Sequence, residues 1–258
     1  ASTSGTLSNP TNSAQTATYT VTPVSGNCTG IDFTVVVTVN PTPNVSTNSQ
    51  TTICSGNQTN IVLGSNVAGA TYSWTVGTIT GGITGASISN GTSIIQTLNN
   101  TGSTTGTVTY IVTPIANSCS GASTNIVVSV NPKPSINSIT NAVCSGQNFN
   151  ITPTSGIIPS GTTYTWSNPV INPSGTITGG SAQLTAQSSI NQTLTNTTNA
   201  TAIATYTITP TSGNCPGNSF SLTITVNPKP SINQINQTIC SGNNFTITPI
   251  NNTNGIVP

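Results

Sequence analysis

Charged side chains are almost missing from this sequence. Its 258 residues include two lysines, one acidic residue and no histidine, so that 1% of the chain is charged and the formal net charge is +1. General acid–base catalysis, hydrolytic triads, paired-carboxylate glycoside hydrolysis and phosphate clamps all need titratable or cationic side chains held together in one site. We therefore predict that the chain is not an enzyme, and we nominate no catalytic, metal-binding or cofactor-binding residue and no cofactor.

The shortage of charge also limits the partners. Binding to nucleic acid or to an anionic membrane surface strengthens with each lysine or arginine brought to the phosphates, and a net charge of +1 provides almost none of this attraction. No apolar run approaches the roughly 18 residues of a membrane-spanning helix. These absences predict no nucleic-acid partner and no insertion into a membrane.

What the sequence does contain is typical of β-structure. Hydrophobic residues make up 33% of the chain and fall in short Val- and Ile-rich runs, whereas disordered chains combine low hydrophobicity with high net charge. In FSLTITV (220–226) apolar and polar residues alternate, which is the period of a strand with one buried face. Threonine favours strands, and the abundant Gly, Asn and Pro favour turns. We predict an all-β protein.

One pattern occurs three times along the chain. The segments ATYTVTPVSGNCTG (17–30), VTYIVTPIANSCSG (108–121) and ATYTITPTSGNCPG (204–217) each precede an alternating strand and a pair of prolines. A second motif follows each proline pair, as TICSGNQTNI (52–61), AVCSGQNFNI (142–151) and TICSGNNFTI (238–247). The first prolines of the three pairs lie 91 and 96 residues apart, a usual size for one β-sandwich domain.

This spacing predicts two complete modules, at residues 44–131 and 135–227. Residues 1–40 are expected to form the C-terminal part of a preceding module and residues 231–258 the N-terminal part of a following one. We therefore expect the sequence to be a piece of a longer chain.

The predicted linkers, at residues 40–43, 131–134 and 227–230, share the pattern NPxP. Their prolines are Pro41, Pro43, Pro132, Pro134, Pro228 and Pro230. Proline fixes φ near −65° and donates no backbone hydrogen bond, so each linker should be a short, semi-rigid spacer that separates neighbouring sheets. Lys133 and Lys229 stand between linker prolines where the first linker has Thr42. The charge is thus not required, and we expect both lysines to face solvent.

Each complete module contains a single tryptophan, Trp74 or Trp166, on the same strand face as a tyrosine. Exposed aromatic rings can stack on sugars, but a lone tryptophan on a central strand is more often the plug of a two-sheet core. We therefore predict that both tryptophans are core residues, together with Tyr110 and Tyr206 on the apolar face of a later strand.

Taken in order, the motifs I/V-C-S-G, Y-x-W, Y-x-V/I-T-P, N/S-C-x-G and V-N-P-x-P resemble the PKD-like, immunoglobulin-like repeats of very large cell-surface adhesins from Bacteroidetes. These include the adhesins of flavobacterial gliding motility, which are exported by type IX secretion. The resemblance covers essentially the whole chain. It implies tandem seven-stranded β-sandwiches that form an extended rod in an extracellular stalk or filament. Some surface repeats bind calcium through acidic side chains, but this chain has only Asp32 to offer.

All six cysteines occupy repeated positions. Cys54, Cys144 and Cys240 lie in the C-S-G motif, and Cys28, Cys119 and Cys215 in the later N/S-C-x-G motif. Without a CxxC pair or a histidine, a metal site is a poor explanation. Structural disulfides formed in an oxidising compartment explain the cysteines better than buried free thiols do.

The sequence leaves two disulfide patterns open. Bridges within one module would be Cys54–Cys119 and Cys144–Cys215. In an immunoglobulin-like topology, however, the C-S-G turn lies between strands A and B and the later cysteine between F and G, at the opposite pole of the sandwich. Modules stacked head to tail would instead bring Cys54 to Cys215, and would leave Cys119 and Cys144 to modules outside residues 1–258.

The leading functional hypothesis is a structural stalk or filament segment of a large secreted adhesin, which serves as a semi-rigid spacer for surface attachment or gliding. The expected location is the bacterial cell surface. The expected partners are neighbouring copies of the module, with filaments associating laterally through weakly charged sheet edges. A surface polysaccharide or another substratum would be bound through regions outside this sequence.

Two alternatives remain. Carbohydrate-binding accessory modules of a secreted hydrolase would need rows of exposed aromatic side chains, whereas aromatics are 4% of the chain. Ice or mineral binding is suggested by Thr-x-Thr runs, but such surfaces need a flat ladder of short coils, and a period above 90 residues does not supply one.

Overall fold

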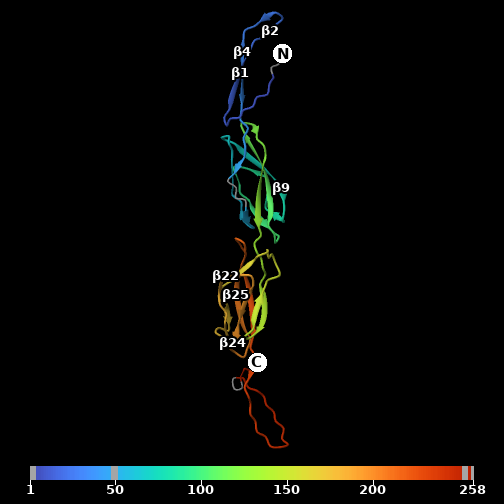
Figure 1. Cartoon of the computed structure of the whole chain (residues 1–258), viewed down its shortest axis with the longest axis vertical. Coiled ribbons are helices and arrows are strands. Elements are labelled where there is room, and N and C mark those ends of the chain that lie inside the picture. The colour runs from blue at the N-terminus through green and yellow to red at the C-terminus, as the bar shows by residue number, and fades with distance from the viewer. Residues whose placement is uncertain (1–3, 48–51, 252–254, 257–258) are drawn as a thin grey trace. The chain divides into compact units, whose positions relative to one another are not determined.

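The computed structural model describes residues 4–47, 52–251 and 255–256; residues 1–3, 48–51, 252–254 and 257–258 of the predicted modules lie outside the described residues. Every helix or strand assigned in the described ranges is a β-strand, which confirms the predicted all-β class (Figure 1). The chain divides into two compact units, Ala1–Asn131 and Pro132–Pro258.

The first unit begins with a two-stranded ribbon. Strands β1 (Gln15–Val21) and β4 (Phe33–Val39) pair antiparallel along their whole length. The connection between them carries a small hairpin, β2 (Val24–Ser25) and β3 (Cys28–Thr29). Many apolar side chains of the ribbon are exposed, among them Phe33 and Val36. The ribbon therefore has no complete core of its own.

The remaining strands of this unit form the first sandwich, β5 to β16. Its larger sheet has the order β11 (Ser89–Asn90), β9 (Thr71–Ile79), β14 (Gly106–Ala116), β16 (Thr124–Asn131) and β6 (Thr52–Cys54), and β15 (Cys119–Ser120) pairs with the end of β14. All these pairs are antiparallel except β6 with β16, which is parallel.

A tight turn joins β14 to β15. Its central residues, Asn117 and Ser118, both have positive φ, at 49° and 66°. Two successive left-handed residues give a turn whose twist matches that of the strands it connects. The N/S-C-x-G motif therefore begins with a hairpin that points the chain back along β14.

The opposing layer of the first sandwich is assembled from short strands. It contains β5 (Ser46–Thr47), β8 (Ile61–Gly64) and β12 (Ser93–Ile94) in one ladder, and β7 (Asn57–Gln58), β13 (Thr97–Asn100) and β10 (Ile83–Thr84) in another. Between the layers lies a hydrophobic cluster that includes Trp74, Tyr110 and Val128.

The second unit contains the second sandwich, β17 to β27. Its larger sheet has the order β17 (Ile139–Cys144), β27 (Phe220–Asn227), β25 (Ala202–Ser212), β19 (Thr163–Trp166) and β22 (Gln183–Gln187), with β20 (Val170–Asn172) and β26 (Cys215–Pro216) on β25. The other layer contains β18 (Asn148–Ile151) with β23 (Ile190–Thr193) and β21 (Ile177–Thr178) with β24 (Thr195–Asn196). The short pair β28 (Ser231–Ile232) and β29 (Gly255–Ile256) follows.

Alternation along the strands builds the core of each sandwich. In β27 the side chains of Phe220, Leu222, Ile224 and Val226 are all buried, and the residues between them are partly exposed. Each side chain of this size contributes about 1.5–3 kcal/mol when fully buried. On the facing layer Phe149 lies against Tyr206, with ring centroids 5.9 Å apart and planes tilted by 60°. The strand period read from the sequence is confirmed here.

Candidate functional site

The C-S-G motif forms a turn that ties the two layers of each sandwich together. In the first sandwich the backbone N–H of Ser55 donates to Asn131 in β16, and that of Gly56 donates to Leu98 in β13, both at 2.8 Å. Gly56 has φ of +80°, a conformation that side chains with a Cβ rarely adopt. Ser145 and Gly146 repeat both bonds at 2.8 Å in the second sandwich. The turn is thus fixed at the C-terminal end of the last strand.

A buried asparagine completes this anchor. The Asn196 side-chain amide donates to Val226 at 2.9 Å and to Ala200 at 2.7 Å, and its backbone N–H donates to the Ser145 hydroxyl at 2.9 Å. Asn100 makes the same three kinds of bond in the first sandwich. Our sequence reasoning missed both asparagines. The signal was present, because I-x-Q-T-L-x-N-T occurs at 94–101 and again at 190–197.

The four aromatic residues named from the sequence are all buried. In the second sandwich the Tyr206 hydroxyl donates to Gln192 Oε1 at 2.6 Å, Gln192 Nε2 donates to the Ser181 carbonyl at 2.7 Å, and Trp166 Nε1 donates to the same carbonyl at 3.1 Å. The first sandwich repeats this network with Tyr110, Gln96, Ser87 and Trp74. Burial raises the pKa of Tyr110 to about 12 and raises that of Tyr206 as well. The rings are therefore core residues, and none forms a sugar-stacking surface.

The glycine of the N/S-C-x-G motif makes room for the proline linker. Its backbone N–H donates to a proline carbonyl, from Gly121 to Pro114 and from Gly217 to Pro210, at 2.9 Å in both sandwiches. A Cβ at Gly121 would lie 1.9 Å from the carbonyl oxygen of Pro43, and a Cβ at Gly217 would lie 2.1 Å from that of Pro134. Only glycine permits these approaches. The linker that leads into each sandwich thus packs on the F–G turn of that same sandwich.

The linker prolines differ in their burial. Pro41, Pro43, Pro132 and Pro134 are buried, Pro228 is partly buried and Pro230 is exposed. Lys229 is exposed as expected, but Lys133 is partly buried. The expectation that both lysines face solvent is therefore confirmed for Lys229 and only partly met by Lys133.

The cysteines are in two different states. Cys54 and Cys215 are each disulfide-bonded, whereas Cys28, Cys119, Cys144 and Cys240 carry free thiols. The bridges Cys54–Cys119 and Cys144–Cys215 are therefore not formed.

The geometry of the first sandwich explains why Cys54 does not bond Cys119. Cys54 lies beside Asn131, next to the Gly106 end of β14, and Cys119 pairs with Ala116 at the other end. Ten residues of strand span roughly 33 Å, and a disulfide tolerates a Cα separation of only about 4.4–6.8 Å. The two cysteines lie at opposite ends of the sandwich.

Comparison with known proteins gives the family. The family model described as the PKD-like domain matches residues 1–43, 51–134 and 141–230, which together are most of the chain. The chain belongs to the PKD-like domain family. A search of curated proteins found no significant match.

Solved structures that resemble this PKD-like chain include cadherin and immunoglobulin domains. Drosophila N-cadherin EC1-3 shares 14% identity, with 86% of this chain and 79% of that chain covered and a TM-score of 0.26. The protocadherin GammaB4 extracellular domain shares 12% identity over 83% of this chain and 38% of that chain, with a TM-score of 0.31. Sidekick-1 immunoglobulin domains 1–5 share 10% identity over 83% of this chain and 46% of that chain, with a TM-score of 0.24. Such distant likeness carries no argument about what the PKD-like chain binds.

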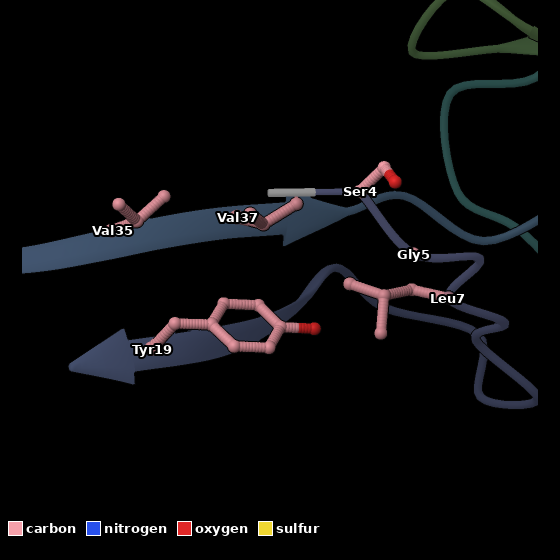
Figure 2. Close-up of a pocket in the computed structure, with 6 residues that line it drawn as sticks. All are labelled: Ser4, Gly5, Leu7, Tyr19, Val35 and Val37. Carbon is pink, nitrogen blue, oxygen red and sulfur yellow. The ribbon is translucent and has the colours of Figure 1, made fainter. Parts of the chain in front are cut away.

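The ribbon at the start of the PKD-like chain has a hollow on its apolar face. It is lined by Ser4, Gly5, Leu7, Tyr19, Val35 and Val37 and measures about 280 Å³ (Figure 2). Tyr19 pairs with Val35 as Tyr110 pairs with Ile126 in the first sandwich, where both side chains are buried. The hollow lies below the usual range of about 300–1,000 Å³ for ligand sites.

Within the described residues, no three His, Cys, Asp or Glu side chains come together as metal ligands. Among the same residues there is no helix long and apolar enough to cross a membrane.

Proposed function

We propose that this PKD-like array is a structural spacer in the stalk or filament of a large secreted adhesin on the bacterial cell surface. The observation that carries the proposal is the packing of the linker on the F–G turn, which occurs at Gly121 and again at Gly217. A linker held by the module that follows it limits the bending of the array at that end. Repetition of such modules gives length in proportion to their number.

The polar residues that recur in both sandwiches support the same role. The serine, glutamine and asparagine of the repeated motifs all bond to groups within their own sandwich. A binding surface would need polar groups or aromatic rings that face outward. In the two sandwiches the tryptophans and tyrosines are buried instead, which disfavours the carbohydrate-binding alternative.

Gliding motility and type IX secretion are part of this proposal through the resemblance of the motifs to flavobacterial adhesin repeats. Under the proposal, the partners along the array are further copies of the module, and adhesion is the task of regions outside these residues. The neutral Ser-, Thr- and Asn-rich surface would keep its hydration with little dependence on salt. Such a surface suits a protein exposed to changing water.

The proposal is tested by shortening the native protein. One or more whole modules would be deleted from the adhesin on the cell, with the cuts made inside the NPxP linkers. A spacer predicts that the ligand specificity is unchanged and that attachment weakens with each module lost, because the binding tip is held closer to the surface. A single deletion that abolishes binding to the isolated ligand would overturn the spacer assignment. So would retention of a glycan by the 258-residue chain on its own.

A further inference from the structure

We propose that the C-S-G turn and the buried asparagine of each sandwich form a mechanical clamp. This clamp holds the sandwich closed when tension enters through one NPxP linker and leaves through the next. The need for a clamp rests on the proposed stalk function, because a stalk that holds an attached cell is pulled at its ends. The clamp itself is inferred from contacts within each unit.

Tension on the second sandwich meets a parallel pair of strands. The chain enters β17 soon after the linker 131–134 and leaves β27 at the linker 227–230. These two strands are neighbours and run parallel over six residue pairs, of which the last is Cys144 with Asn227. A pull on the two linkers therefore draws β17 and β27 past each other along their length.

This direction of pull loads the whole ladder at once. The hydrogen bonds of a parallel pair are evenly spaced along the strands, so all of them resist sliding together. When an antiparallel pair is pulled apart at one end, its bonds break one after another instead. Sliding of β17 past β27 therefore requires a larger force than peeling of an antiparallel pair.

Two further bonds hold the last residues of β27. The Asn227 carbonyl accepts from the backbone N–H of Ser145 at 2.8 Å, and the Val226 carbonyl accepts from the side-chain amide of Asn196 at 2.9 Å. Ser145 and Asn196 also contact each other, since the Asn196 backbone N–H donates to the Ser145 hydroxyl at 2.9 Å. The residues at which tension leaves the sandwich are thus held by both the turn and the asparagine.

The asparagine bond crosses from one layer of the sandwich to the other. Asn196 lies in β24 of the smaller layer, whereas Val226 lies in β27 of the larger sheet. β17 is an edge strand, and four of its six residues are exposed, so water can compete for its ladder bonds as they stretch. Asn196 and Val226 are both buried, and a hydrogen bond away from water is not replaced in this way. The buried bond therefore supports the ladder where water weakens it.

The first sandwich has the same arrangement. β6 runs parallel to β16 and pairs Cys54 with Asn131. The backbone N–H of Ser55 donates to the Asn131 carbonyl at 2.8 Å. The side-chain amide of Asn100 donates to the Val130 carbonyl, also at 2.8 Å. A load-bearing role requires such recurrence, because the weakest module of an array under tension unfolds first.

The opposite end of the second sandwich provides a comparison within the same molecule. β19 and β25 are antiparallel, and at this end their ladder pairs Thr163 with Thr211. The exposed residues Ser160 and Asn214 lie just beyond that pair. A pull on these two residues peels β19 from β25 and leaves the clamp unloaded.

Force spectroscopy in two pulling directions tests the clamp. Handles would be attached to the 258-residue chain through alkyne-bearing residues, at Lys133 and Lys229 for the first direction and at Ser160 and Asn214 for the second. A thiol reductant would keep every cysteine reduced, so that no disulfide carries load. We expect a severalfold larger unfolding force in the first direction. Equal forces in the two directions would overturn the proposal.

The extension released identifies the unfolding event. The handles are 96 residues apart in the first direction and 54 in the second. At about 3.5 Å per residue, complete unfolding releases up to about 340 Å and about 190 Å, less the folded separation of the handles.

Asn196→Ala separates the clamp from a general loss of stability. Forced unfolding depends on the interactions that break before the transition state. The variant should therefore lower the unfolding force in the first direction and leave it unchanged in the second, where peeling begins at the other end. Ser145→Ala removes the hydroxyl that bonds to Asn196 and should have the same effect. The matched control is Asn191→Ala, at an exposed position, which should change neither force.

An equal fall in both directions for Asn196→Ala would show that the asparagine only stabilises the fold, and would refute the clamp. Such a result leaves the spacer role standing, because that role is tested by module deletion. A spacer without a clamp would pass the deletion test and still unfold at the same force in both directions.

Discussion

The buried asparagine of the second sandwich offers the sharpest test of the reasoning about the C-S-G turn. Its side chain makes four hydrogen bonds: it donates to Ala200 and Val226 and accepts from the backbone N–H and the hydroxyl of Thr198. Asn196 is 3% exposed. In Asn196→Ala these bonds are lost, and the Val226 carbonyl loses the amide that donates to it.

The size of the effect follows from the number of bonds. A net contribution of about 0.5–1.5 kcal/mol for each of the four hydrogen bonds predicts a loss of about 2–6 kcal/mol in the free energy of unfolding of the second sandwich. A domain of this size has an m-value of about 1 kcal/mol per molar urea, so the midpoint should fall by at least about 2 M.

Each sandwich has one tryptophan, which allows the two transitions to be separated. In a Trp74→Phe background, Trp166 is the only tryptophan, and its fluorescence reports on the second sandwich alone. The matched control is Asn191→Ala, since Asn191 is exposed and makes one side-chain bond, to Ser189 at 3.4 Å. A midpoint shift for Asn196→Ala no larger than that of the control would refute the reasoning. Asn100→Ala should leave the Trp166 transition unchanged.

Three further predictions concern the linker, the tyrosines and the surface. Gly217→Ala should lower the unfolding midpoint of the second sandwich by an amount that corresponds to about 1–3 kcal/mol, because the added Cβ would overlap the Pro134 carbonyl. The control is Ser219→Ala, at an exposed position, and an equal shift in both variants would contradict the linker contact. Stability should be level below the ordinary tyrosine pKa of 10.0 and fall above it. Burial raises the pKa of Tyr110 to about 12 and raises that of Tyr206 as well, so above pH 10 the unfolded chain releases protons that the folded chain keeps. Tyr110→Phe should reduce that fall in a pH series of urea melts, and a fall that begins below neutral pH would exclude this cause. Because 1% of the chain is charged, its melting temperatures in about 0.02 M and about 0.5 M NaCl should agree. A large difference between them would show that charge–charge interactions contribute to stability, contrary to this prediction.

The sequence predicted the elements whose residues alternate strictly. Strand β27 and the burial of Trp74 and Trp166 could be read directly, because period and residue type coincide there. The parallel pairing of β6 with β16 could not, since β6 has three residues and its position depends on the turn that follows.

The buried polar network could not be predicted from single residues either. Gln96 and Asn100 look like ordinary polar strand residues. Gln96 is partly buried and Asn100 is buried, and they bond to Tyr110 and Val130, which lie far along the chain. Only the repetition of their motif 96 residues later marked them out. Gly121 could not be singled out from the sequence either, because the need for glycine at this position comes from the close approach of Pro43.

The parallel pairing of β6 with β16 sets the timing of folding. Thr52 pairs with Ser129, 77 residues further along the chain. A chain that emerges from a channel with its N-terminus first cannot close this ladder until the last strand of the sandwich is outside. Contacts between residues so distant in sequence form slowly, so each module should remain open during its own passage. Folding then completes one module at a time, at the moment when the NPxP linker appears.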